Sequence, residues 1–322
     1  MAVNEVMMSK YQVKPLNPDN LKTYSLKERG SKVSAADFSR VCAPEASLKE
    51  FIDSLPNILG AQDFKDFLGF YQVARGKQKA RIWGMGAHVI KVGLNPVLID
   101  LLKTGWISGL ALNGAGIIHD FELAQVGQTS EDVGAQIKAG EFGMARETGK
   151  FLNAAIREAA DEDIGLGETV GRALAGSNLP HVELSLLATA YDLNIPVTVH
   201  VAIGTDTIHF HPDCDGRALG KATLRDFYLF SSLVRELDNG GVYLNAGSAV
   251  VLPEVFLKAV SYVRNLGFPL KGFKTAVFDF LHHYRPDQNV VKRPLEGEGK
   301  GYYFIGQHEI LIPLFAAALK SA

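Results

Sequence analysis

The composition of the chain is that of a globular protein with a sizeable core. Its 322 residues are 47% hydrophobic and 21% charged, and the net charge of -2 gives no basis for nucleic-acid binding. Two cysteines, Cys42 and Cys214, exclude a disulfide framework and fit a reducing cytoplasm. No stretch resembles a membrane span, and the first residues lack the order of a signal peptide. We therefore expect a cytoplasmic enzyme or binding protein.

Hydrophobic periodicity predicts alternating helices and strands after a polar N-terminal extension at residues 1–45. Residues 46–322 are predicted to form a single domain. Helices are expected at residues 47–59, 64–74, 89–102, 144–160, 182–193, 222–236, 253–264 and 310–319. Strands are expected at residues 80–83, 106–112, 195–204, 241–244 and 274–280. This alternation is typical of an α/β fold, a Rossmann-like parallel sheet flanked by helices.

The polar segment at residues 127–142 allows two interpretations. Its TSED sequence would cap a helix, because Ser and Thr accept hydrogen bonds from first-turn amides. Alternatively, the segment is a mobile loop over a site.

Three predicted strands end in turns of glycine and small polar residues. These turns are NGAG at residues 113–116, GTD at 204–206 and NAGS at 245–248. Ligands of open α/β sheets bind beyond the carboxyl ends of the strands, so the three turns predict a rim for a dinucleotide. His119, Asp120 and Glu122 follow the first turn directly and would supply polar chemistry. An ordinary structural role is the alternative for each turn, because no GxGxxG fingerprint is convincingly present.

Several of the nine histidines follow predicted strands. In an extended segment, His209 and His211 would lie on one face and, with nearby aspartates, would form a zinc site. Histidines that form hydrogen bonds or act in catalysis without a metal are the favoured alternative, since no compact metal signature is present.

The segment HYRPDQNVVKRP concentrates charged residues. It is interpreted as an anion-binding loop, as a catalytic lysine loop, or as a structural turn fixed by its two prolines. Lysine acts as a nucleophile only when burial or a neighbouring cation lowers its pKa. For Lys292, the candidate cations are Arg285 and Arg293.

The order and spacing of several pieces resemble the deoxyhypusine synthase family over roughly residues 84–294. The pieces are AHVIKVGLNPVLIDLL, LNGAGIIHDFEL, ELSLLATAYDLNIPV, LNAGSAVV, and TAVFD with YRPDQNV. The resemblance implies a single-domain NAD-binding fold and a homotetramer. It also implies oxidation of a polyamine such as spermidine with NAD, followed by transfer of an aminobutyl group to an acceptor amine.

The resemblance also assigns roles to individual residues. The NAD site would be lined by Asn113, Gly114, Gly116, Gly204, Thr205, Asp206, Gly247, Ser248, Thr275 and Ala276. Lys292 would hold the imine, and His119, Asp120 or His283 would move protons. The substrate would contact His88, Glu122, Arg285 and Asp287. The chain departs from the family pattern at His119, which replaces an acid, at His88, which replaces an asparagine, and at Pro294, where the family lysine falls.

Three functions are consistent with these features. The first is a deoxyhypusine synthase-like transferase that uses NAD and a small amine substrate. The second is a different enzyme on the same scaffold, with a histidine-rich and metal-assisted site and without NAD. The third is a ligand-binding or assembly protein that has lost catalysis.

Overall fold

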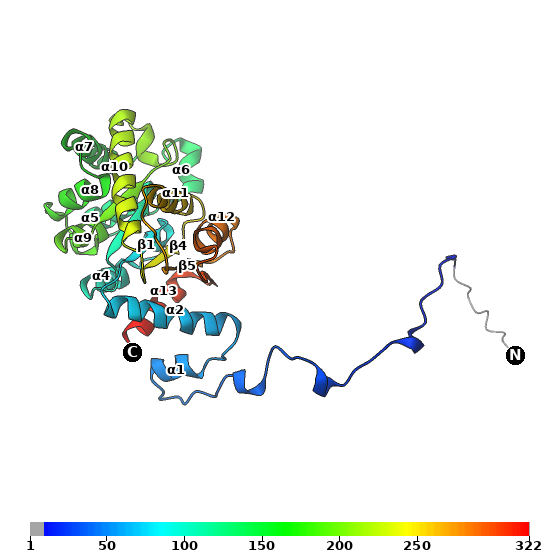
Figure 1. The fold of residues 1–322 in the computed structure, drawn as a ribbon. Coiled ribbons are helices and arrows are strands. Elements are labelled where there is room, and N and C mark those ends of the chain that lie inside the picture. Colours follow the sequence, from blue (N-terminus) through cyan, green and yellow to red (C-terminus); the bar gives the residue numbers. More distant parts are fainter. Residues whose placement is uncertain (1–9, 322) are drawn as a thin grey trace. The chain divides into compact units, whose positions relative to one another are not determined.

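A six-stranded parallel sheet forms the centre of the computed structural model, which describes residues 10–321 (Figure 1). The strands are β1 (Arg81–Met85), β2 (Gly109–Asn113), β3 (Val197–His200), β4 (Val242–Ala246), β5 (Lys274–Asp279) and β6 (Tyr302–Ile305). They lie in the order β3-β2-β1-β4-β5-β6, and every neighbouring pair is parallel. The predicted Rossmann-like α/β fold is confirmed. Strand order reverses between β1 and β4, which makes that junction the topological switch point.

Helices cover both faces of the sheet. The longer ones are α1 (Leu48–Ser54), α2 (Leu59–Gly76), α4 (Asn95–Lys103), α5 (Gly114–Val126), α6 (Val133–Ala139), α7 (Arg146–Glu162), α8 (Leu166–Ala175), α9 (Leu186–Asp192), α10 (Gly216–Arg235), α11 (Val251–Asn265) and α13 (His308–Lys320). Short helical segments are α3 (His88–Lys91), η4 (Val182–Leu184), η5 (Thr207–Phe210), α12 (Tyr284–Pro286), η6 (Asp287–Lys292) and η7 (Arg293–Leu295). Helices α10 and α11 pack on one face, and α2, α4 and α13 pack on the other.

The two faces of the sheet bury different side chains because alternate residues of a strand point in opposite directions. On β4, Tyr243 packs against Phe256 of α11, with ring centroids 3.8 Å apart. Its neighbours Val242 and Leu244 belong to the core on the opposite face. Burial on both faces explains why the central strands are almost continuously apolar.

Several predicted boundaries are wrong, and each difference has a local cause. The helix expected at residues 89–102 is two helices, because the chain turns at Gly93, which has φ +82°. The helix expected at 182–193 divides at Ser185, whose side chain caps α9 by accepting from the amide of Ala188. Strand β6 was not among the predicted strands.

The chain divides into two units, Met1–Phe38 and Ser39–Ala322. In the first unit, residues 10–38 contain three short 3-10 turns, at Pro18–Asn20, Leu26–Glu28 and Ala35–Asp37. A side chain caps each turn, and none of the turn residues is buried. Residues 1–9, for which the sequence lacked a signal peptide pattern, lie outside the described residues. Within residues 10–321, no helix combines the length and apolarity needed to cross a membrane.

Candidate functional site

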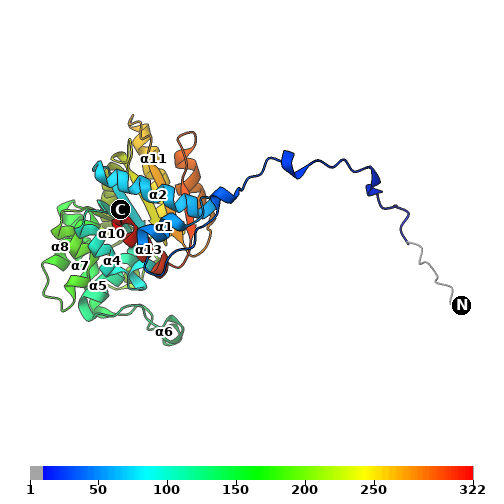
Figure 2. The ribbon, with the colours of Figure 1, turned by 90° about the horizontal axis from the view of Figure 1, so that it is seen from below.

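A cavity of about 200 Å³ lies at the carboxyl ends of β2 and β3, and we call it the β2–β3 cavity. Helix α5, the loop after β3 and the segment at residues 127–145 enclose it, and Lys91 of α3 completes the wall. Three carboxylates line it, from Glu122, Glu131 and Asp206, together with His119. Figure 2 shows α6 standing away from the other helices, as the tip of the segment that forms one wall. The cavity therefore combines acidic groups with a wall that extends from the rest of the domain.

His119 and Glu122 are joined through the hydroxyl of Thr129. Thr129 Oγ1 donates to Glu122 Oε2 at 2.5 Å, and His119 Nδ1 lies 2.6 Å from the same hydroxyl oxygen. While Glu122 is ionised it can only accept, so the hydroxyl proton points to Glu122 and His119 Nδ1–H donates to the oxygen. His119 Nε2 then carries a lone pair, and none of the described contacts occupies it. The arrangement gives His119 a fixed tautomer with a free proton-accepting atom.

Burial favours the neutral form of both partners. It raises the pKa of the Glu122 carboxyl, against the hydrogen bonds from Thr129 and Thr148, which lower it. Burial, with a smaller effect from the charge of Lys91, lowers the pKa of His119 to about 4. A cation that entered the cavity would stabilise the ionised carboxylate and recover part of the cost of burying it.

The NGAG turn leads into α5, but groups of the protein already occupy the start of this helix. Asn113 Oδ1 accepts from Gly116 N at 3.2 Å, and the backbone of Ala115 faces the carboxylate of Asp206 and lowers its pKa, although burial raises it more. Asp206 also packs so closely on Gly114 that a Cβ there would overlap its carboxylate. A pyrophosphate would meet this negative charge instead of free amides. The turn therefore does not fit the phosphates of NAD, although the buried, unpartnered Oδ2 of Asp206 suits a hydroxyl or ammonium donor.

His209 stabilises the GTD loop that carries Asp206. Its Nδ1 accepts from the amides of Gly204 and Asp206, at 3.0 and 3.2 Å, so the proton lies on Nε2. That Nε2 is 3.7 Å from Asp206 Oδ2, and burial raises the pKa of the aspartate and lowers that of the histidine.

The predicted zinc site at His209 and His211 depended on an extended backbone, and the structure does not have one there. Residues 207–210 form a 3-10 turn, in which His209 faces the GTD loop while His211 Nε2 lies 2.8 Å from the carbonyl oxygen of Gly143. Among residues 10–321, no three His, Cys, Asp or Glu side chains converge in a way that could hold a metal ion.

Asp120 follows His119 in the sequence but faces the protein interior. It is 0% exposed, and its carboxylate accepts from Ser185 Oγ, from the amides of Leu186 and Leu187, and from Asn95 Nδ2. Burial raises its pKa to about 6. These contacts hold the start of α9 against α5, a structural role in place of the expected proton transfer.

The predicted lysine loop lies at the other side of the sheet, after β5. Lys292 Nζ donates to Asp287 Oδ2 at 2.6 Å, and its side chain is 59% exposed. Arg285 pairs with Glu254 at 3.5 Å, and His283 lies 3.8 Å from Asp279. Lys292 is therefore exposed and paired with an acid, whereas a nucleophilic lysine needs burial or a neighbouring cation to lower its pKa.

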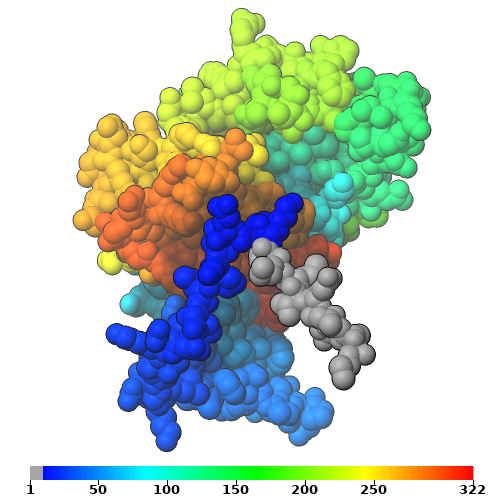
Figure 3. All heavy atoms as spheres, turned by 90° about the vertical axis from the view of Figure 1, so that its right-hand side faces the viewer, coloured from blue at the N-terminus to red at the C-terminus, as the bar shows by residue number. Residues whose placement is uncertain are grey.

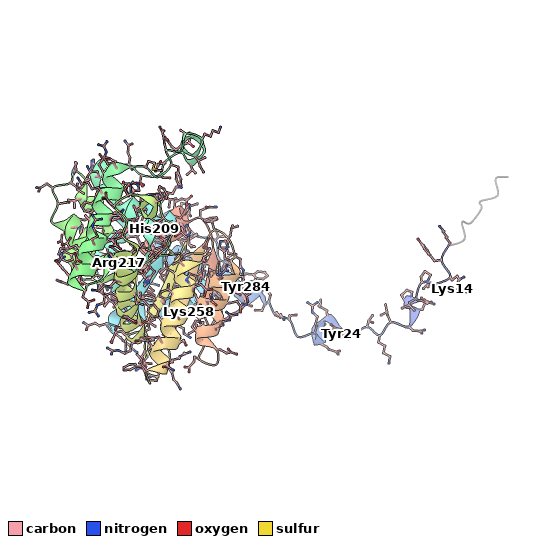
Figure 4. The ribbon with its side chains drawn as sticks, turned by 90° about the horizontal axis from the view of Figure 1, so that it is seen from above. Lys14, Tyr24, His209, Arg217, Lys258 and Tyr284 are labelled. Carbon is pink, nitrogen blue, oxygen red and sulfur yellow. The ribbon has the colours of Figure 1, made fainter. Side chains whose placement is uncertain are left out.

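The views of the molecule show this separation. In Figure 3 the orange surface of the segment after β5 and the green surface of the α6 region are separate parts of one face. Figure 4 labels Tyr284 on that orange segment and His209 on the β3 side of the sheet. Of the predicted site residues, the β2–β3 cavity is lined by His119, Glu122, Thr205 and Asp206. The residues predicted in the lysine loop do not line it: His283, Arg285, Asp287 and Lys292.

The remaining residues assigned to NAD are distributed along β4 and β5. Gly247 and Ser248 follow β4, and Ser248 Oγ accepts from Leu252 N at 3.2 Å. Thr275 and Ala276 are both 0% exposed within β5, and Thr275 Oγ1 donates to the carbonyl oxygen of Val290. Thr275 and Ala276 therefore lie inside the sheet and not at its binding edge, because the carboxyl end of β5 is Asp279.

Sequence reasoning missed several residues of the site, among them Lys91, Thr129, Glu131 and Phe142. Of these four, the last three belong to the segment at residues 127–142, for which a loop over a site was one of two interpretations. The expected helix also exists, but its cap is Asp132, which accepts from Ala135 N. Thr129 instead bonds the network of the cavity. The available signal was the TSED sequence itself, which supplies both the cap and the cavity residues.

Comparisons with known proteins show the fold alone. No family model and no curated protein matches the chain. A mutant of AgrE in its binary complex with L-arginine has a TM-score of 0.51 and 14% identity, covering 87% of this chain and 34% of that one. ArgZ, a cyanobacterial arginine dihydrolase, has a TM-score of 0.48 and 17% identity, covering 82% and 33%. A putative deoxyhypusine synthase from Entamoeba histolytica has a TM-score of 0.49 and 11% identity, covering 85% and 93%. The chain thus spans about a third of the length of the first two proteins, and what it is similar to is a Rossmann-like α/β fold.

Proposed function

We propose that the β2–β3 cavity binds a small amine in its ammonium form and that His119 accepts a hydrogen bond from it. The convergence of three carboxylates, from Glu122, Glu131 and Asp206, on one cavity carries this proposal. Glu122 and Glu131 already accept hydrogen bonds from hydroxyl and amide groups, and an ammonium group adds further donors and a positive charge. His119 Nε2 then accepts a hydrogen bond from the ammonium, while its Nδ1–H keeps donating to Thr129.

The size of the site favours an extended amine. A second cavity of about 470 Å³ adjoins the first and shares Glu122 and Glu131 with it, and Glu147 lies in its wall. A linear diamine or triamine would place one ammonium in each cavity, with Phe142 beside the inner one. Spermidine and putrescine are suitable probes.

The more specific proposal is the aminobutyl transfer that the resemblance to deoxyhypusine synthase implies. The acidic cavity and the Rossmann-like sheet support it. The Asp206 carboxylate at the start of α5 and the exposed position of Lys292 do not. NAD titration separates the two proposals: amine binding without NAD binding leaves the first intact and removes the second. A homotetramer and a cytoplasmic location stay predictions.

Calorimetric titration with spermidine tests the amine proposal. We expect E122Q to weaken binding about tenfold, or about 1.4 kcal/mol, because a neutral amide replaces the carboxylate. E236Q is the matched control, since Glu236 lies in a different cavity near the amino ends of the strands. Equal affinity of the wild-type protein and E122Q would place the amine elsewhere.

A further inference from the structure

His88 and His308 meet at the switch point of the sheet and do not line the β2–β3 cavity. His88 begins α3 after β1, and His308 begins α13 after β6. Their Nδ1 atoms lie 2.9 Å apart. A hydrogen bond between two ring nitrogens needs one donor and one acceptor, so the two rings must hold different tautomers at this contact.

The surroundings of His308 determine which ring donates. His308 is 0% exposed, and its Nε2 lies 3.2 Å from the carbonyl oxygen of Phe278, which can only accept. The proton of His308 is therefore on Nε2. Burial lowers the pKa of His308, against the hydrogen bond to Phe278 and the charge of Asp279, and so favours a neutral ring with a lone pair on Nδ1. His88 Nδ1–H must then be the donor.

Gly247 makes room for this arrangement. Its φ is +65°, and a Cβ at this position would lie 2.9 Å from His308 Cε1. The glycine of the NAGS turn, which the sequence assigned to a cofactor, thus lets the His308 ring lie beneath the turn.

We propose that His88 accepts a proton at Nε2 from an O–H or N–H group of a small ligand at the switch point, and that His308 is its positioning residue. No described contact occupies His88 Nε2, and the ring is partly exposed. Phe280, whose ring centroid lies 5.4 Å from that of His88, offers a flat apolar surface to the body of the ligand. The ligand O–H or N–H bond breaks and the Nε2–H bond forms. A ligand anion then faces an imidazolium whose Nδ1–H still donates to His308.

Nitrogen-15 NMR of the imidazole rings tests the tautomer directly. We expect His88 in the wild-type protein to carry its proton on Nδ1 with a bare Nε2, and His308 to carry its proton on Nε2. H308N keeps an acceptor for His88 and should preserve this tautomer. H308L removes the acceptor and should give a mixture. A proton on His88 Nε2 in the neutral wild-type protein overturns the proposal.

Carbethoxylation by diethyl pyrocarbonate, followed by peptide mass spectrometry, measures the reactivity of the lone pair. The reagent attacks an unprotonated ring nitrogen, so the rate at His88 should fall about threefold in H308L and stay unchanged in H308N. H200L, which replaces a different buried histidine, is the control and should react at the wild-type rate at His88. Equal rates in the wild-type protein and H308L would contradict the positioning role. If H308L does not fold, the tautomer of His88 measured by NMR in the wild-type protein still decides.

Discussion

The carboxylate of Asp206 occupies the space that a Cβ would need at Gly114, at the point where β2 ends and α5 begins. This contact assigns a specific reason to the first glycine of the NGAG turn: the helix begins beneath an acidic side chain from the loop after β3. The same carboxylate lines the cavity. The NGAG turn suggests a phosphate site by its sequence, but in the structure it borders an acidic cavity.

The first prediction concerns the volume at position 114. G114A adds a methyl group where the Asp206 carboxylate lies, so the GTD loop must shift. We expect the unfolding free energy to fall by about 1–3 kcal/mol, as measured by denaturant titration, and spermidine affinity to fall as well.

G220A is the matched control, because Gly220 lies within α10 and has open space around it. Replacing this helical glycine should raise the unfolding free energy by about 0.5–1 kcal/mol. Equal stability of G114A and the wild-type protein would show that Asp206 does not hold its position against the helix.

The second prediction concerns the pH dependence of amine binding. Burial raises the pKa of both Glu122 and Asp206, so a fraction of each is protonated in weakly acidic solution. Affinity for spermidine should therefore increase as pH rises through these pKa values and then level off. Calorimetry across pH 4–8 measures the profile, and an affinity independent of pH would argue against buried acids as the amine ligands.

The third prediction concerns stability and Asp226 of α10. Its Oδ2 accepts from the amides of Gly167 and Val199, and burial raises its pKa to about 7. A folded-state pKa above the unfolded value means that the folded protein binds the proton more tightly. This group's contribution to stability is complete below about pH 4 and is lost as pH rises to about 7, by up to about 4 kcal/mol. D226N should remove this slope from the unfolding free energy.

Asp215 provides the control of opposite sign. It caps α10 by accepting from the amides of Arg217 and Ala218, and these hydrogen bonds lower its pKa. Its contribution is present at neutral pH and is lost as pH falls through its folded-state pKa. D215N should therefore destabilise the protein more at neutral than at acidic pH. If D226N keeps the wild-type slope between pH 4 and 7, Asp226 is not its source.

The fourth prediction separates the lysine loop from the cavity. Lys292 forms an exposed ion pair with Asp287, so K292A should change the unfolding free energy by less than about 1 kcal/mol. Because Lys292 does not line the β2–β3 cavity, spermidine affinity should also stay unchanged. Loss of amine binding in K292A would instead favour the role that the resemblance to deoxyhypusine synthase gives to this lysine.

The sequence was sufficient for the elements whose patterns are local. Strand β2 and its glycine turn were predictable because an apolar run ends at Asn113, and the side chain of Asn113 then caps α5. Five of the six strands were expected. Strand β6 was harder to predict because it has only four residues and follows a glycine-rich stretch.

The site was less predictable because it depends on which way each side chain faces. His119 and Asp120 are neighbours on α5, yet one lines a cavity and the other is buried against α9. No local pattern distinguishes them, because successive helical residues point in directions about 100° apart. Similarly, the pairing of Asp206 with Gly114 joins residues from different strand ends, and only the strand order brings them together.

Backbone NMR of the isotope-labelled protein during titration with spermidine tests the central claim most directly. The account predicts that the largest amide shifts occur at residues 119–131 and 204–207, around the β2–β3 cavity. Residues 282–292 after β5 should change little. Shifts concentrated at residues 282–292, with none around Glu122 and Asp206, would contradict the account and place the amine at the lysine loop.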